Sequence, residues 1–160
     1  MLLSMSPELF KLIENVLKTA VSRAEAQAVY LCDKGGSIIS LYSRVGDISQ
    51  EENVAALAAG SFFATQEVAR LLGEPGFQCV FHQGSNRGVY MQNMTSDMLM
   101  LVIFGRDSNA GLVRLYSNQA CKNLEQMLQA AEQDPMLNGS AGFGMAFEID
   151  ETAKPFFRAT

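Results

Sequence analysis

The sequence is poor in the residues that build metal centres and hydrolytic sites. It holds one histidine, His82, and three cysteines, Cys32, Cys79 and Cys121, among 160 residues. A single histidine excludes multi-histidine metal sites, and three widely spaced cysteines in apolar segments predict neither a disulfide framework nor a zinc motif. We therefore expect no metal site, and the unpaired thiols favour a reducing cytoplasm.

Charge is also scarce. Charged residues make up 18% of the chain, below the usual share of about 25%, and the net charge is −5. A negative balance removes the attraction that drives most binding to nucleic acids and anionic membranes, so we expect neither partner. A monomer with so few charges would struggle to cover its surface, which favours a buried self-contact.

Targeting segments and membrane spans are not expected either. No basic region precedes an apolar segment at the N-terminus, and the longest apolar run, Met98 to Phe104, is far shorter than the roughly 20 residues that cross a bilayer. Phosphate-binding motifs of the forms GxxxxGK[ST] and GxGxxG are missing, and no pair of carboxylates suggests an acid and a base. We therefore predict no cofactor and no catalytic residue, and interpret His82 as a structural or surface residue and the cysteines as buried, inert thiols.

The first half of the chain predicts two helices around a hairpin. Ser6 and Pro7 cap a helix over 6–25 that carries an apolar stripe. Two β-type runs, 28–33 and 37–44, flank Lys34-Gly35-Gly36 and predict the hairpin. Ser49 and Glu52 have the spacing of a capping box, and the helix that they open ends near Leu72.

The second half predicts an antiparallel meander followed by a helix. The β-type runs are 77–83, 87–95 and 97–105, and the residues 107–109 cap a helix over 110–132. The unalternating apolar run of the last strand predicts a central strand covered on both faces. The element order is αββαβββα in one domain, 1–133, and the residues 134–160 are expected to form a flexible linker and a C-terminal tail.

The helix over 49–72 carries apolar residues on two faces. One face, which we expect in the core, holds Val54, Leu57, Ser61, Thr65, Val68 and Leu72. The opposite face holds Ala56, Ala59, Gly60 and Phe63, with Arg70 near the end, where a solvated helix would carry lysine and glutamate. We interpret it as a partner surface, with cover by another part of this chain as the alternative.

Three segments together resemble the Roadblock/dynein light chain family, and within it the bacterial MglB type. They are the hairpin AVYLCDKGG (28–36), the helix NVAALAAGSFFATQEVARLLG (53–73) and the segment NAGLVR (109–114), and the likeness covers residues 6–132. The resemblance implies an α/β (α+β), roadblock/profilin-like fold with a central five-stranded antiparallel sheet and helices on its faces. It also implies a homodimer formed through the second helix and the third strand.

The resemblance further implies a function in cell polarity, as a regulator or state-selective adaptor of a small Ras-like GTPase. Such proteins are not enzymes themselves and rearrange the GTPase's own residues without inserting an arginine, so Arg44, Arg87, Arg106 and Arg114 are not nominated as catalytic. The residues expected at the dimer or partner interface are Ala56, Ala59, Gly60, Phe63, Arg70, Arg44 and Asp47.

A sensor module for small molecules is the alternative function. Antiparallel sheets covered by helices also build sensor domains, and methionine adapts its shape to varied ligands. Met91, Met94 and Met100 are close in sequence and are expected to line the pocket in that case.

Overall fold

The computed structural model describes residues 5–94 and 97–133, and the elements follow the predicted order. The helices are α1 (Pro7–Ala24), α2 (Glu51–Leu71) and α3 (Ala110–Gln133). The strands are β1 (Ala28–Asp33), β2 (Ile38–Ser43), β3 (Cys79–Gln83), β4 (Arg87–Met94) and β5 (Met98–Gly105). The predicted linker and tail, 134–160, lie outside the described residues, so the domain boundary stays a prediction.

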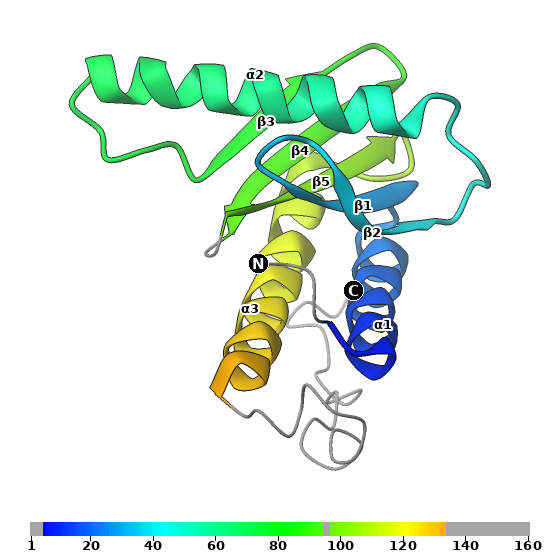
Figure 1. Cartoon of the computed structure of the whole chain (residues 1–160). Coiled ribbons are helices and arrows are strands. Elements are labelled where there is room, and N and C mark those ends of the chain that lie inside the picture. Colours follow the sequence, from blue (N-terminus) through cyan, green and yellow to red (C-terminus); the bar gives the residue numbers. More distant parts are fainter. Residues whose placement is uncertain (1–4, 95–96, 134–160) are drawn as a thin grey trace, which may run out of the picture.

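The strands form one antiparallel sheet of five, in the order β2-β1-β5-β4-β3. The meander β3-β4-β5 and the hairpin β1-β2 are confirmed, and β5 lies at the centre, as its apolar run predicts. Figure 1 shows α1 and α3 side by side on one face of this sheet and α2 across the other. Because both faces of β5 are covered, its residues from Met98 to Phe104 are all buried.

The face toward α1 and α3 contains the larger part of the core. Ile13 and Leu17 of α1 and Leu124 of α3 pack with Leu31 of β1 and Met100 of β5, all almost fully buried. Each such side chain contributes about 1.5–3 kcal/mol through its removal from water. This layer of α1 and α3 therefore covers one face of the sheet, and α2 covers the other.

The face toward α2 has a smaller core. Tyr30 of β1, Leu101 of β5 and Phe62 of α2 are fully buried there, together with the small side chains Ala55 and Ala59. Small residues on the underside of α2 let the helix lie close to the sheet. The larger apolar side chains Leu57, Val68 and Leu71 of α2 lie outside this core.

Helix starts were predicted with mixed success. Ser6 Oγ accepts a hydrogen bond from Leu9 N at 3.2 Å, and Asn109 Oδ1 accepts one from Leu112 N at 2.9 Å, so both of these caps are confirmed. The capping box of Ser49 and Glu52 is wrong. The cap of α2 is Gln50, in a left-handed conformation and without a side-chain cap bond. The carboxylate that reaches back is that of Glu51, which accepts from Ile48 N at 3.3 Å.

Candidate interaction surface

The outward face of α2 is apolar and exposed. Leu57 is 76% exposed, Leu71 72% and Val68 48%, and Gly60 and Ala64 are exposed between them. Steps of three and four residues place this set on one side of a helix. The small residues in the middle make the surface flat enough for another chain to approach closely. Contiguous exposed apolar surface of this kind marks interaction sites, and we call these five residues the α2 stripe.

The predicted burial of α2 is wrong in part. Leu57, Val68 and Leu72 were expected in the core, but all are exposed, Leu72 by 69%. Ala59 was expected on the outward face and is only 1% exposed, against the sheet. The physical reason is that apolar side chains lie all around this helix, so periodicity does not identify which side meets the sheet. The sheet binds the side that carries Ala55, Ala59 and Phe62.

The other predicted interface residues lie in different surroundings. Ala56 is exposed, whereas Phe63 is half-buried, with its ring edge-on to Phe62 at a centroid distance of 5.8 Å. Arg70 forms a forked ion pair with Glu67, with Nε at 2.9 and 3.0 Å from the two carboxylate oxygens. This hydrogen bond lowers the pKa of the Glu67 carboxyl.

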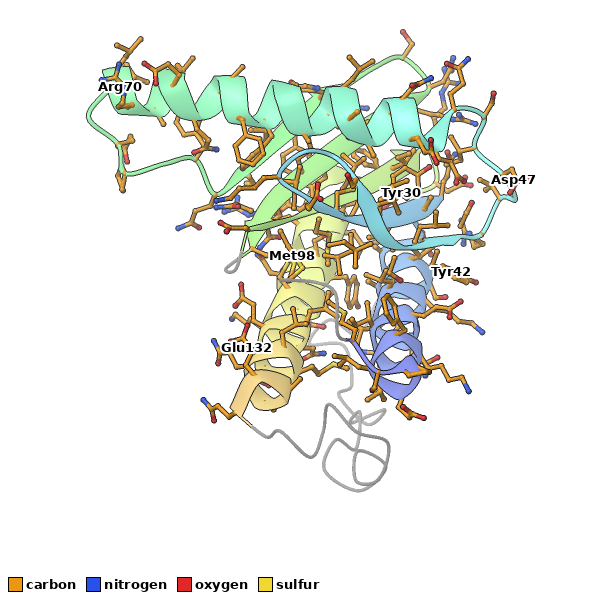
Figure 2. The ribbon with its side chains drawn as sticks, viewed as in Figure 1. Tyr30, Tyr42, Asp47, Arg70, Met98 and Glu132 are labelled. Atoms are coloured by element: carbon orange, nitrogen blue, oxygen red, sulfur yellow. The ribbon has the colours of Figure 1, made fainter. Side chains whose placement is uncertain are left out.

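The predicted set is spread along the whole helix. Figure 2 shows Arg70 at the C-terminal end of α2 and Asp47 in the loop before its N-terminus. Arg44 and Asp47 are both exposed in that loop. A shared interface role for these two residues and the α2 stripe stays a prediction.

The edge strand β3 is the second feature of this side of the molecule. Its one neighbour in the sheet is β4, so within residues 5–94 and 97–133 its outer edge is not paired with another strand. Val80 and Phe81 are half-buried, and His82 is exposed. An open edge of this kind is a template for pairing with a further strand.

The titratable groups buried between α2 and the sheet have the properties of a protein core. Tyr30 lies between α2 and the sheet, and its hydroxyl has no hydrogen-bond partner in the described structure (Figure 2). Burial, and to a smaller extent the charge of Glu51, raises the pKa of Tyr30 to about 12. Burial likewise raises the pKa of the Cys32 thiol on this side, and of the Cys121 thiol on the side of α1 and α3, to about 12. These thiols are therefore protonated at neutral pH and are poor nucleophiles.

The methionines do not line a common pocket. Met91 faces α2, whereas Met94 and Met100 face α1 and α3, with the sheet between them. The expectation that the three line one pocket is wrong, because alternate residues of a strand point to opposite faces. The structure thus removes the specific basis of the sensor alternative.

Other groups that the sequence singled out are dispersed. Arg44, Arg87, Arg106 and Arg114 are all exposed. Arg106 Nε donates to the carbonyl oxygen of Ser85 at 3.4 Å. In the described part of the chain no group of three His, Cys, Asp or Glu side chains is arranged to hold a metal ion, and no helix is long and apolar enough to cross a membrane.

Sequence reasoning missed two features of this side of the molecule. Leu71 and Ala64 belong to the outward face of α2. The sequence signal that would have indicated this is a second set of apolar residues at helical spacing. Gln66 binds the chain that leads into β3. No sequence signal identified that contact, because its partner is backbone eleven residues away.

The five-stranded antiparallel sheet with three helices is the fold of a roadblock domain. The Roadblock/LC7 domain model matches residues 12–104, and the protein belongs to this family. The expected fold class is confirmed, since solved roadblock domains share the five-stranded sheet with three helices.

Solved structures of MglB proteins are similar to this chain. MglB of Myxococcus xanthus is 32% identical, with a TM-score of 0.69, and the match covers 76% of this chain and 98% of that one. The gliding protein MglB of Thermus thermophilus is 26% identical, with a TM-score of 0.74 and coverage of 79% and 96%. An MglB with a tetrameric arrangement is 25% identical, with a TM-score of 0.74 and coverage of 79% and 95%.

Proposed function

We propose that this protein forms a homodimer that regulates a small Ras-like GTPase in cell polarity. The observation that carries the proposal is the α2 stripe, a flat apolar face that the described residues leave uncovered. Burying Leu57, Val68 and Leu71 against a second copy would remove from water three large side chains that are 48–76% exposed in the described structure. Each would contribute on the order of 1–3 kcal/mol.

The open edge of β3 supports the same assembly. A second copy related by two-fold symmetry can add its own β3 antiparallel to this edge, which joins the two sheets and satisfies the edge backbone. The two copies of α2 then lie across one continuous sheet. The resemblance to the MglB type implies this arrangement, and the tetrameric arrangement of one MglB relative is a precedent for self-association.

Regulation of the GTPase, rather than catalysis by this chain, is the activity that we propose. Roadblock proteins are generally regulatory rather than catalytic. GTPase switch loops rearrange when the γ-phosphate is lost, so a partner that contacts them has a different affinity for the two nucleotide states. The dimer is expected to use α2 and the loop from Arg44 to Asp47 for this contact, in the cytoplasm, without a cofactor, metal, nucleic acid or membrane.

The decisive experiment is calorimetry with a purified Ras-like GTPase from the same genome. We expect tighter binding to the form loaded with a GTP analogue than to the GDP form, and faster GTP hydrolysis when the dimer is present. Equal affinities for both forms would indicate a passive scaffold, because no difference in binding free energy would exist to drive a switch. No binding to either form would contradict the proposal.

A further inference from the structure

Gln66 joins α2 to the chain that leads into the edge strand. Its Nε2 donates to the carbonyl oxygen of Phe77 at 3.0 Å, and its Oε1 accepts from Phe77 N at 2.9 Å. The side-chain amide thus satisfies both backbone groups of one residue, as a neighbouring strand would. Gln66 is half-buried, one helical turn beyond Phe62 on the side of α2 that faces the sheet. We call this pair of hydrogen bonds the Gln66 clasp.

The clasp lies close to the start of β3. Cys79, the first residue of that strand, is two positions after Phe77, and the intervening Gln78 accepts through its carbonyl from Asn93 N at 3.0 Å. Gly76 also lies against the amide, since a β-carbon there would be 2.9 Å from Gln66 Oε1. The chain is therefore held to α2 just before it pairs with β4.

The other end of this connection is held as well. Glu74 N donates to the Ala69 carbonyl oxygen at 2.9 Å, and Gly73 N to that of Arg70 at 3.1 Å, with Gly73 in the left-handed region at φ +78°. This is the hydrogen-bond pattern of a Schellman motif. Figure 1 shows the chain turning at the end of α2 and returning beneath it to β3. The connection is thus fixed at both ends.

We propose that Gln66 is a positioning residue for self-association, which holds the edge of β3 at one defined place relative to the α2 stripe. This role rests on the proposed dimer. A second copy must meet both surfaces at once, and an edge strand that shifts relative to α2 would have to be ordered during association. Ordering an interface segment during association costs free energy and so weakens binding. Because the Gln66 clasp orders the edge of β3 before association, it lowers that free-energy cost.

Gln66→Glu tests the role with almost no change of shape. At neutral pH the new carboxylate only accepts hydrogen bonds, so the bond to the Phe77 carbonyl is lost and two oxygen atoms face each other. We expect the dissociation constant of the dimer, from sedimentation equilibrium, to rise about tenfold relative to the wild type. Circular dichroism at the same temperature must show both proteins folded.

Acidic pH should restore dimer formation by Gln66→Glu. A protonated carboxyl group donates through one oxygen and accepts through the other, as the amide does. An ordinary glutamate has a pKa of about 4.3; at this position the facing Phe77 carbonyl disfavours the charged form, whereas the Phe77 N–H favours it. The ratio of the variant's dissociation constant to that of the wild type should therefore fall as the pH is lowered through that range, to within about twofold near pH 4. Gln129→Glu, an exposed position on α3, is the charge-matched control and should leave the ratio near one at every pH.

A second variant covers the case in which Gln66→Glu does not fold. Gln66→Met keeps the length and the helix propensity but makes no hydrogen bond to Phe77, so it should weaken the dimer about tenfold at every pH. An unchanged dissociation constant in Gln66→Met, or a deficit in Gln66→Glu that persists at low pH, would overturn the positioning role. If the wild type itself stays monomeric at high concentration, the dimer is refuted and this role with it.

Discussion

The backbone of Gly36, in the turn between β1 and β2, lies directly against the backbone of Ala56 in α2. A β-carbon built on Gly36 would be 2.5 Å from Ala56 Cα and 3.0 Å from the Ala55 carbonyl oxygen. Gly36 also has φ +84°, in the left-handed region that other residues rarely adopt. The hairpin therefore limits where the first half of α2 can lie on the sheet, and only glycine allows this contact.

Gly36→Ala should destabilise the fold more than Gly46→Ala does. Gly46 has nearly the same conformation, φ +82°, but nothing lies within 4 Å of its would-be β-carbon. The left-handed conformation alone costs roughly 1–2 kcal/mol for alanine, and at position 36 the clash with α2 adds to it. Urea unfolding should show a larger loss for Gly36→Ala, by about 1–3 kcal/mol. Equal losses would mean that α2 moves away freely.

Gly60→Arg should separate the dimer while the monomer stays folded. Gly60 has open space around it, so the arginine fits the monomer, yet within the α2 stripe it places a bulky charge where a second copy would approach. Sedimentation velocity should show a dimer for the wild type at micromolar concentration and a monomer for the variant, with unchanged circular dichroism. Gln119→Arg, at an exposed position on α3, is the control. A Gly60→Arg dimer of normal affinity would show that the α2 stripe is not the self-contact.

Tyr30→Phe should not destabilise the fold, whereas Tyr90→Phe should. The buried hydroxyl of Tyr30 has no partner in the described structure, whereas that of Tyr90 donates to Gln92 Oε1 at 2.9 Å. Removing an unsatisfied buried group should leave the free energy of unfolding unchanged or raise it by up to about 1 kcal/mol, and removing the bonded one should lower it by about 1 kcal/mol. Thermal unfolding of both variants measures the difference. A loss at Tyr30→Phe as large as at Tyr90→Phe would indicate a hydrogen-bond partner for Tyr30.

Cys79 should react with iodoacetamide before the other thiols. With the pKa of Cys32 and Cys121 raised to about 12, each is thiolate in only about one molecule in ten thousand near pH 8. Cys79 is half-buried on the edge strand and more accessible. Peptide mass spectrometry of the folded protein should find Cys79 modified first, and all three thiols should react alike in guanidinium. Comparable native rates at Cys32 or Cys121 would contradict the buried geometry.

Single alanine variants of Arg44, Arg87, Arg106 and Arg114 test how hydrolysis is accelerated. An inserted arginine contributes about 10³–10⁵ in rate, whereas a surface that positions the GTPase's own residues loses much less at any one contact. We expect losses below about tenfold in single-turnover GTP hydrolysis with the dimer in excess. A loss of about a thousandfold at one arginine, with binding retained, would identify it as catalytic.

Local patterns in the sequence predicted the elements and their order. Ser6 and Asn109 provide side-chain oxygens for exposed helix N–H groups, and Gly73 adopts the left-handed conformation that ends α2. These interactions involve residues a few positions apart, so they can be read without knowing the tertiary structure. The unalternating run from Met98 to Phe104 also predicted a strand covered on both faces, because only full burial permits such a run.

The side of α2 that meets the sheet was decided by tertiary structure alone. Ala59 and Leu57 are both apolar and lie on different sides of one helix, so hydrophobic periodicity favours neither side as the buried one. The close approach of Gly36 to Ala55 and Ala56, and the burial of Phe62 in the sheet core, place the side that carries Ala59 against the sheet and leave Leu57 outside. Strand register likewise decides that Met91 and Met100 lie on opposite faces of the sheet. The Gln66 clasp depends on where the chain between α2 and β3 passes the helix. Such contacts join residues through space, and a single sequence does not record which of two chemically similar surfaces the fold buries.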